Sequence, residues 1–419
     1  MKTVYSKILN LFVFLSILVI FFISIFAFVF GEYKFTNRMI LYSNDAERAL
    51  LLPWEKIDSF AYDRIQLKEA RKIISNASNV RIGIVDTGIS VSHAEMKGRA
   101  NAEYSYDANP GSASPLTDFE AHGTSVASVI CNNNKHLNRI CDDVQLCSLK
   151  IQNEKNPATV WKLASAINFA SRNGIKILNI SLGGNEEDPT LKEAIENYDG
   201  LIITAAGNRD QNIDDYPTYL PSYTYENILV IGASTAYDEK YVLSNYSSTK
   251  VDLFAPGDMI PCIYDNDYYY SSGTSMAAPF VTGVAALILA KYPDMHPLHL
   301  KRTIMNNVDR AETLRGLCVT GGRLNAYNSL RNPDQHMNVC TPVNNSLTYH
   351  HAKCSICGYE TTEPHSWYNF KGTNRCSCGM TAGIVPIKPG TLALDENNEQ
   401  VCENLLGEIC EFNETKKSI

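Results

Sequence analysis

The stretch GTSMAAPFVTGVAALILAKYP (273–293) carries the strongest structural signal in this chain of 419 residues. After Ser275 the residues are small or apolar, and none is charged before Lys291. A helix that is apolar all round has to be buried, so we predict a core helix whose small residues allow close packing against a sheet. Packing alone explains those small residues. A chemical role for Ser275 requires partners elsewhere in the sequence.

Around this segment, apolar strands alternate with helical patterns. The expected strands are VRIGIVDTG (80–88), VQLCSLKI (144–151), IKILNISLGG (175–184), LIITAAGN (201–208) and NILVIGAS (227–234). The expected helices are TVWKLASAINFASRNG (159–174), LKEAIENYDG (191–200) and LHLKRTIMNNV (298–308). Continuous apolar strands separated by helices are typical of a parallel sheet that is covered on both faces. The sequence therefore predicts a three-layer α/β fold with a mostly parallel central sheet.

The composition is that of an ordinary globular protein. Hydrophobic residues make up 45% of the chain and charged residues 20%, which is enough apolar material for a large core. The formal net charge is −8, and the sequence contains neither a basic stripe nor a phosphate-binding glycine loop. This balance argues against nucleic-acid binding and nucleotide chemistry. We expect a monomer.

The N-terminal segment, residues 1–31, is expected to direct the chain to a membrane. Lys2 and Lys7 precede an almost uninterrupted apolar run from Ile8 to Phe30. This run is long enough to cross a bilayer as a helix, and its basic flank predicts a cytoplasmic N-terminus. Two interpretations stay open, an uncleaved membrane anchor and a cleaved signal peptide. Both make the rest of the chain extracellular, either secreted or anchored to the membrane.

Polar residues stand at the carboxyl ends of three predicted strands. They are Asp86, the turn at 181–184 and the Gly207–Asn208 pair. In α/β sheets the active residues collect at these strand ends. A further polar residue, His122, begins the segment HGTSVAS, whose small residues suit a packed helix. We therefore expect these groups to meet near Ser275.

A serine hydroxyl becomes an effective nucleophile only when neighbouring groups activate it. It needs an imidazole to take its proton and a carboxylate to fix the tautomer of that imidazole. It also needs hydrogen-bond donors for the oxyanion that forms. His122 is the candidate base and Asp86 the candidate orienting carboxylate. Asn208 and the backbone N–H of Ser275 are the candidate oxyanion donors.

These residues occur in segments that resemble the subtilisin-like serine proteases, over residues 52–332. The order Asp, His, Ser is the order of that family. The matching segments are IVDTGISVSHAEMKGR (84–99), HGTSVASVI (122–130), ILNISLGG (177–184), IITAAGN (202–208), YENILVIGAS (225–234), LFAPGDMI (253–260), GTSMAAPFVTGVAALILAKYP (273–293) and GGRLNAYNSL (321–330). The resemblance implies a serine endopeptidase with the triad Asp86, His122 and Ser275, an acyl-enzyme intermediate and an oxyanion held by Asn208. It also implies a cleft for a protein or peptide substrate, formed by Ser181, Leu182, Gly183, Ala205, Ala206 and Gly207.

The chain departs from the family pattern in several places. Ser125 stands where many members have a second histidine, at a position that is structural in the family. Residues 32–79 are too few for the family's usual propeptide, so we do not expect maturation by its self-cleavage. Glu95 and the loop CNNN (131–134) either bind calcium or form a plain polar loop. Asp214–Asp215 either favours a basic substrate side chain or is solvated. The chemistry itself requires no cofactor.

A Cys/His-rich segment, residues 340–380, follows the expected catalytic domain. Its closely spaced cysteines are Cys354, Cys357, Cys376 and Cys378. Two pairs of thiolates are typical of a structural zinc ribbon, so we predict one zinc site from these four residues. Nearby histidines, which could replace a thiolate or bind a second ion, are His350, His351 and His365. A pair of disulfides is the alternative, because export would allow the chain's twelve cysteines to oxidise.

The predicted organisation has five parts. They are a signal peptide or membrane anchor (1–31), an N-terminal lead-in (32–79), a subtilisin-like catalytic domain (80–332), a zinc-ribbon-like module (340–380) and an acidic tail (381–419). The first hypothesis of function is an exported serine endopeptidase. The second comes from another class of protein, a catalytically silent surface protein that binds its partners through the Cys/His module.

Overall fold

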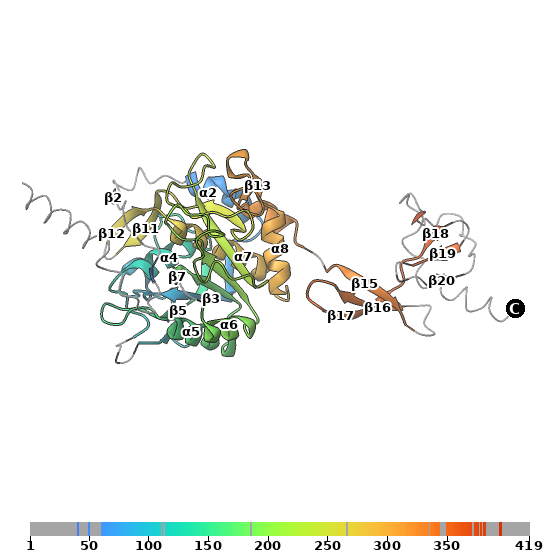
Figure 1. Ribbon diagram of the computed structural model, residues 1–419, viewed down its shortest axis with the longest axis horizontal. Helices are drawn as coiled ribbons and strands as arrows, with labels where there is room; N and C mark the ends of the chain where they lie inside the picture. Colours follow the sequence, from blue (N-terminus) through green and yellow to red (C-terminus); the bar gives the residue numbers. More distant parts are fainter. Residues whose placement is uncertain are drawn as a thin grey trace, which may run out of the picture.

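The computed structural model describes most of the chain between Phe60 and Ala382. Within this range it excludes residues 110, 112–113, 185–186, 265–266, 335, 344–348, 371–372, 377 and 379. It also describes three short strands outside the range, Ile40–Leu41, Ala49–Leu50 and Leu394–Asp395. The predicted anchor or signal segment, residues 1–31, lies outside the described residues. A large α/β body precedes a C-terminal module of strands (Figure 1).

The body is built on a nine-stranded sheet. Every neighbouring pair of strands is parallel, except for the antiparallel pair β13 and β14 at one edge. This arrangement confirms the predicted, mostly parallel sheet. In spatial order the strands are β13 (Asp309–Arg310), β14 (Gly322–Arg323), β10 (Leu253–Pro256), β9 (Ile228–Ser234), β8 (Leu201–Ala205), β6 (Ile177–Ile180), β3 (Asn76–Asp86), β5 (Asp143–Lys150) and β4 (Tyr106–Asp107).

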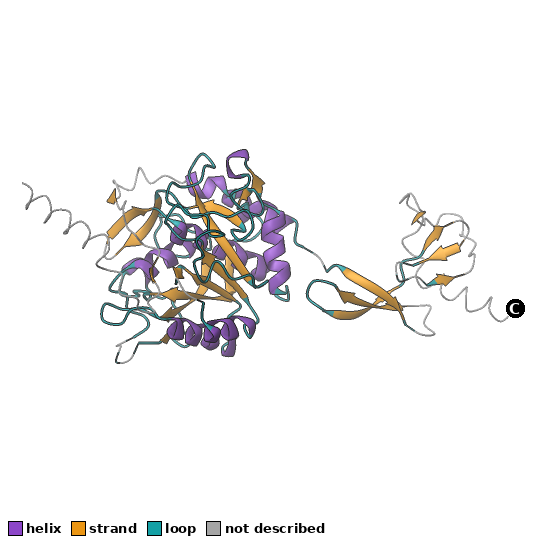
Figure 2. Ribbon diagram, in the orientation of Figure 1, coloured by secondary structure: helices purple, strands orange, loops and turns teal. Residues whose placement is uncertain are grey.

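Helices cover both faces of this sheet, as Figure 2 shows. On β3, Ile82 and Ile84 belong to one buried cluster and Val85 to the other, because successive side chains of a strand point to opposite faces. The first cluster includes residues of α2 (Phe60–Arg64), α3 (Leu67–Arg71), α4 (His122–Ile130), α7 (Thr274–Lys291), α8 (Pro297–Asn306) and α9 (Ala326–Arg331). The second includes residues of α5 (Val160–Arg172) and α6 (Pro189–Glu196). The predicted three-layer α/β fold is confirmed.

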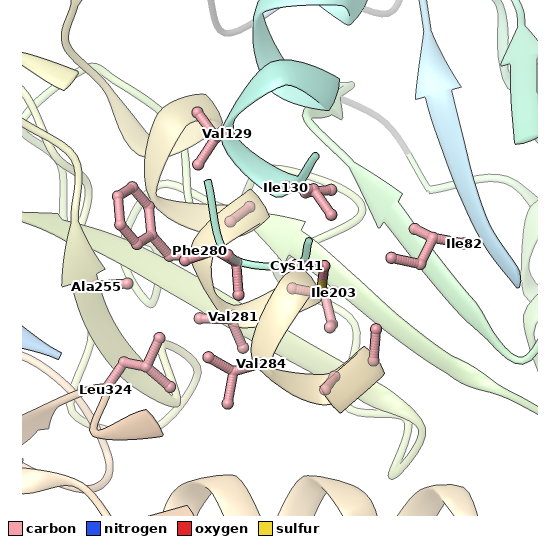
Figure 3. Close-up of a cluster of buried hydrophobic side chains, with 14 of the residues drawn as sticks. Ile82, Val129, Ile130, Cys141, Ile203, Ala255, Phe280, Val281, Val284 and Leu324 are labelled. Carbon is pink, nitrogen blue, oxygen red and sulfur yellow. The ribbon is translucent and has the colours of Figure 1, made fainter. Parts of the chain in front are cut away.

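Helix α7 lies at the centre of the first cluster. All side chains of residues 274–289 are buried, and Figure 3 shows Phe280 among buried residues of α4 and of the sheet. A Cβ at Gly283 would lie only 2.6 Å from the Cβ of Ile140, so this contact requires a glycine. Within the described residues, α7 is the one helix long and apolar enough to span a membrane, and 89% of that window is buried in the protein. It is a core helix, as predicted.

Four smaller sheets complete the described structure. In the body, β1 (Ile40–Leu41) pairs with β7 (Leu182–Gly183), and β11 (Ile260–Tyr264) and β2 (Ala49–Leu50) flank β12 (Asp267–Ser271). The module contains β15 (Asn338–Pro342), β16 (Tyr349–Cys354) and β17 (Glu360–Pro364), followed by β18 (Tyr368–Phe370), β19 (Thr373–Arg375), β20 (Thr381–Ala382) and β21 (Leu394–Asp395). Two 3₁₀ helices are η2 (Ala94–Met96) and η3 (Glu312–Leu314).

Strand β3 lies where the sheet reverses its direction of growth. The next two strands of the chain, β4 and β5, lie on one side of β3, whereas β6, β8, β9 and β10 lie one after another on its other side. In open α/β sheets, ligands bind in the crevice outside the carboxyl ends of the strands at such a switch point. Asp86 is the last residue of β3. The topology therefore places Asp86 where a site is expected.

Candidate active site

Asp86 and His122 meet at the carboxyl end of β3. Both side chains are buried, and Asp86 Oδ1 lies 2.7 Å from His122 Nδ1. Because an ionised carboxylate only accepts hydrogen bonds, this contact puts the proton on Nδ1 and leaves the lone pair on Nε2. Asp86 Oδ1 also accepts the N–H of Thr87 at 2.8 Å. The two residues predicted to be base and orienting carboxylate are thus in hydrogen-bond contact.

A glycine lets α4 approach the end of β3. The N–H of Gly123 donates to Thr87 Oγ1 at 2.9 Å. A Cβ on Gly123 would lie 2.2 Å from the carbonyl oxygen of Gly88 and 3.0 Å from the Cβ of Asp86. Any side chain at this position would push α4 away from the strand. The imidazole of His122, the first residue of α4, would move with it.

Asp118, which the sequence did not single out, fixes the first turn of α4. Its Oδ1 accepts the N–H of Ala121 at 2.9 Å, and its Oδ2 accepts the N–H and the hydroxyl of Thr124 at 2.8 and 2.7 Å. Burial raises the pKa of this carboxyl, and the hydrogen bonds from Thr124 act against that shift. A negative charge is favourable at a helix N-terminus. Asp118 thereby positions the turn that carries His122.

Replacing Asp118 by alanine is expected to lower kcat about 10- to 100-fold through misplacement of His122. Unfolding should become easier by about 2 kcal/mol, because buried donors lose their acceptor. Asp188→Ala is the matched control, since Asp188 caps α6 by accepting two backbone N–H groups. It should cost about 1 kcal/mol and leave kcat unchanged. Peptide turnover and thermal unfolding measure both effects, and equal losses of kcat in the two variants would contradict the positioning role.

Ser275 lies in the first turn of α7, beside the end of β6. Pro279 has no N–H to donate to the carbonyl of Ser275 four residues earlier, and the hydroxyl of Ser181 donates to that carbonyl at 3.5 Å. Ser181 Oγ accepts from Asn179 Nδ2 at 3.2 Å, and Asn179 Oδ1 accepts from the hydroxyl of Thr282 at 2.8 Å. These buried polar contacts hold the backbone of Ser275 against the sheet. The Ser181 side chain, predicted to line the cleft, is turned toward α7.

Asn208 is held beside the start of α7 by Thr274. Its Oδ1 accepts the N–H and the hydroxyl of Thr274, both at 2.9 Å. The Thr274 hydroxyl oxygen also accepts the N–H of Gly207 at 3.1 Å. Gly273 has a φ of 142°, and a Cβ there would lie 2.8 Å from Asn208 Nδ2. The structure thus places Asn208 beside Thr274, the residue before Ser275, and no sequence signal identified Thr274.

The two segments predicted to bind substrate, 181–183 and 205–207, differ in the hydrogen bonds that their backbone groups make. Leu182–Gly183 pairs antiparallel with β1, with Leu41 opposite Leu182 and Ile40 opposite Gly183. At Ala206 and Gly207 the backbone groups are hydrogen-bonded inside the protein. The N–H of Ala206 donates to the carbonyl of Ile231 at 2.9 Å, and the carbonyl of Gly207 accepts the N–H of Asn245 at 2.8 Å. The prediction of strand addition is therefore corrected for Ala206 and Gly207, because their backbone polar groups already have internal partners.

Internal contacts also hold Asp214 and Ser125. The carboxylate of Asp214 accepts the hydroxyls of Ser247 and Thr249, both at 2.7 Å. These contacts favour a structural role over the base of a pocket for a basic side chain. The hydroxyl of Ser125 donates to the carbonyl of Ile263 at 2.6 Å and so links α4 to β11. That contact agrees with a structural position.

Glu95 and the Asn-rich loop form a hydrogen-bonded network. Glu95 Oε1 accepts from Asn134 Nδ2 and from the hydroxyl of Tyr268, both at 3.3 Å. Asn132 Nδ2 donates to the carbonyl of Ser128 at 2.9 Å. The side chains that were candidates for calcium ligation are engaged with one another and with the backbone. This arrangement favours the polar loop over a calcium site.

The four predicted zinc ligands separate into two groups. Their members are Cys354 and Cys357 with His299 and His336, and Cys376 and Cys378 with His350 and His365. His350 and Cys354 lie four positions apart in strand β16, and a strand rises about 3.3 Å per residue, which is about 13 Å in all. The expected single site with four cysteines is thus corrected to two mixed groups. None of the ten cysteines that the structure describes forms a disulfide.

His299 and His336 were not identified from the sequence, because they lie outside the Cys/His-rich segment. His299 belongs to α8 of the body, and it comes into contact with Cys354 only in the folded chain. Burial raises the pKa of the Cys354 thiol, but backbone N–H groups of Cys357 and Ile356, together with the two histidines, lower it to about 5. This thiol is therefore readily ionised.

Known proteases resemble the body of this chain. The subtilase family model matches residues 77–332. A thermophilic serine proteinase of Bacillus sp. (strain AK1) is 29% identical over 262 residues, which is 62% of this chain and 63% of that protein. Subtilisin DY of Bacillus licheniformis is 32% identical over 228 residues, 52% of this chain and 79% of that protein. Thermitase of Thermoactinomyces vulgaris is 27% identical over 283 residues, 67% of this chain and 98% of that protein.

The chain belongs to the subtilase family of serine endopeptidases, because the family model covers more than half of its length. The family match begins in strand β3 and ends just after α9. The module that carries the four cysteines of the two Cys/His groups follows the match.

Proposed function

We propose that this chain is an exported serine endopeptidase with Asp86, His122 and Ser275 as its catalytic triad. The 2.7 Å contact between His122 Nδ1 and Asp86 Oδ1, at the switch point of a subtilase sheet, carries this proposal. Ser275 lies in the first turn of α7, which packs against both β3 and α4. The three residues thus come from three elements in mutual contact.

In this mechanism Ser275 Oγ attacks the carbonyl carbon of the scissile peptide bond while His122 Nε2 takes its proton. Asp86 holds the Nδ1–H and stabilises the imidazolium that forms. His122 then protonates the leaving amine nitrogen, the carbon–nitrogen bond breaks, and an acyl-enzyme remains on Ser275. Water enters, loses a proton to His122 and hydrolyses the ester, which restores the free hydroxyl.

Asn208 and the backbone of Ser275 would hold the oxyanion. Asn208 Oδ1 accepts from Thr274, and the amide nitrogen of Asn208 is the group that would donate to the oxyanion, because the amide oxygen only accepts. The N–H of Ser275 belongs to the first turn of α7, where N–H groups have no carbonyl from a preceding turn. The positive end of the helix dipole favours negative charge at the same point.

Asn208→Ala is expected to lower kcat about 10²–10³-fold with little change in KM, as measured for the oxyanion asparagine of subtilisin. Asn208→Asp should be at least as inactive, because it keeps the acceptor for Thr274 but loses the donor. Asn212→Ala, in the same loop, is the control and should retain full turnover. Steady-state peptide kinetics decide this point, and an active Asn208→Asp enzyme would exclude the donor role.

A protein or peptide substrate would bind as an extended strand along Leu182–Gly183. This edge pairs with β1, and an edge that accepts one antiparallel strand offers the same backbone groups to another. The substrate would therefore take the place of Ile40–Leu41. Specificity would come from pockets beside this strand, because the strand pairing itself involves only backbone atoms.

The apolar run 8–30 supports export of the catalytic domain, either as an anchor or as a signal peptide. The enzyme would then act outside the cell as a monomer, secreted or anchored to the membrane. Fractionation of the producing cells, with detection of the chain by an antibody, separates the two. An intact chain in the membrane fraction indicates an anchor, and a shortened chain in the medium indicates a signal peptide.

A peptide-library cleavage assay tests the activity itself. We expect cleavage at internal peptide bonds, and a cleavage profile that also defines the preferred side chains. A folded chain that cleaves no peptide and no unfolded protein would favour the second hypothesis, a catalytically silent protein that binds through its Cys/His module.

A further inference from the structure

Two groups of nitrogen and sulfur ligands lie outside the proposed catalytic machinery. In the first, Cys354 Sγ lies 3.4 Å from His299 Nε2, and Cys357 Sγ lies 3.4 Å from His336 Nδ1. The four ligand atoms all lie within 4.8 Å of one another. Cys354 and His299 are buried, so their polar atoms require a partner in the protein interior.

The second group is more deeply buried. Cys376 Sγ lies 3.4 Å from His350 Nδ1, and Cys378 Sγ lies 3.4 Å from His365 Nδ1. The two Nδ1 atoms are only 3.2 Å apart. All four side chains are buried, with 0–8% of their surface exposed. Two sulfur and two nitrogen atoms therefore converge on one point.

These separations are those of a tetrahedral zinc site. Zinc binds sulfur at about 2.3 Å and imidazole nitrogen at about 2.0–2.1 Å. A tetrahedron with those bond lengths separates a sulfur from a nitrogen by about 3.5 Å, and two nitrogens by about 3.3 Å. The distances in both groups agree with these values to within a few tenths of an ångström. A thiol that donates to one imidazole explains a single contact, but not the approach of two Nδ1 atoms in the second group.

We propose that each group binds one Zn²⁺ through two cysteines and two histidines, and that the first ion joins the module to the catalytic body. His299 comes from α8 of the body, His336 from the connection between body and module, and the two cysteines from the module. In Figure 1, α8 lies on the side of the body that faces β15, β16 and β17. The first zinc would therefore act as a staple between two parts of the chain.

A carboxylate supports the ligand role of His299. Its Nδ1 lies 2.7 Å from Asp334 Oδ2, while its Nε2 faces Cys354. Histidines that bind metals generally donate their second ring N–H to a carboxylate, which fixes the tautomer and orients the ring. Asp334 also accepts from Arg302 Nε at 2.9 Å. His350 repeats the pattern less tightly, with Nε2 at 3.8 Å from Glu363 Oε2.

The module needs such ions for physical reasons. Its strands are short, and a segment of this size seldom buries enough apolar surface to fold alone. The free energy of structural zinc binding then contributes directly to folding. The first site would in addition fix the orientation of the module, because one of its ligands belongs to the body. Two ions, rather than one, are the stoichiometry that this arrangement requires.

Metal analysis of the full chain tests the proposal, with purification in zinc-containing buffer followed by removal of loosely bound ions. We expect two zinc ions per chain in the wild type and one each in His299→Ala and His350→Ala. His351→Ala is the matched control, since His351 is the neighbour of His350 and belongs to neither group, and it should keep two. Peptide hydrolysis by each variant reports that the body is folded. The zinc count does not depend on peptide hydrolysis, so failure of the proposed protease activity would leave the zinc result valid.

Two further measurements separate the sites. Asp334→Asn should weaken zinc binding at the first site about 10–100-fold, measured by competition with a chelator, and leave the second site unchanged. Hydrogen exchange in the connection at 333–337 should increase in His299→Ala but not in His350→Ala. Unchanged exchange in His299→Ala would refute the staple. A disulfide between Cys354 and Cys357, one ion per chain, or loss of all zinc from both histidine variants would refute two separate sites.

Discussion

Replacing Ser275 by alanine is expected to lower kcat for peptide hydrolysis by about 10⁶-fold while KM changes little. Subtilisin loses this much when its triad serine is removed, because no acyl-enzyme forms and only substrate binding and the oxyanion donors remain. Ser275 is buried in the first turn of α7, among residues that are already small. Alanine removes the hydroxyl and little packing, so the free energy of unfolding should change by less than about 1 kcal/mol.

Ser272→Ala is the control for this prediction. Its hydroxyl accepts the N–H of Met259 and donates to Asp258, both at 2.9 Å, three residues before the proposed nucleophile. Turnover by Ser272→Ala should remain within a few-fold of the wild type. Comparable activity in Ser275→Ala and Ser272→Ala would mean that another group attacks the substrate.

Asp86→Asn has the second largest expected effect, a loss of about 10⁴-fold in kcat. Asp86 accepts both the Nδ1–H of His122 and the N–H of Thr87. In the variant, an amide nitrogen that faces the imidazole donates to Nδ1 and puts the proton on Nε2. That tautomer cannot take a proton from Ser275. Because the two side chains have nearly the same shape, the fold should be retained.

Asp107→Asn is the matched substitution, since Asp107 also ends a strand of the same sheet. It should leave kcat within a few-fold of the wild type. The comparison of kcat between the two asparagine variants separates an effect on the imidazole from a general effect of lost charge. Near wild-type turnover by Asp86→Asn would exclude the orienting role of this carboxylate.

The sequence predicted the fold because its patterns are local. Apolar strands that alternate with helices imply a covered parallel sheet, and the all-apolar segment after Ser275 implies a core helix. The carboxyl ends of parallel strands meet at one edge, which is why Asp86 and Asn208 were identified from residues far apart in the chain. The resemblance to the subtilases then assigned a role to each residue.

The supporting residues could not be predicted in the same way. Asp118 stands in an ordinary polar loop, and its role follows from the path that the loop takes around the start of α4. Thr274 resembles any threonine before a helix until Asn208 is seen beside it. The internal partners of Ala206 and Gly207 are equally invisible in the sequence. Hydrogen bonds between distant segments depend on the finished fold.

The ligand grouping in the Cys/His segment also could not be predicted from the sequence. Its cysteine spacing predicted a metal site, and the cysteines were grouped together because they are neighbours in sequence. The extended strand β16 holds His350 and Cys354 apart. Each pair of cysteines therefore lies beside two histidines rather than beside the other pair of cysteines. Two of those histidines, His299 and His336, lie before the segment, and only the packing of α8 brings His299 to Cys354.

Covalent labelling by a fluorophosphonate, followed by mass spectrometry of the digested chain, tests the central claim most directly. We predict a single adduct on Ser275 of the wild type, none in Ser275→Ala, and much slower labelling in Asp86→Asn. Labelling of Ser275 requires both an activated hydroxyl and a site open to a reagent that mimics the tetrahedral intermediate. A folded wild-type chain that takes up no label, or takes it up on another residue, would contradict a serine endopeptidase built on Ser275.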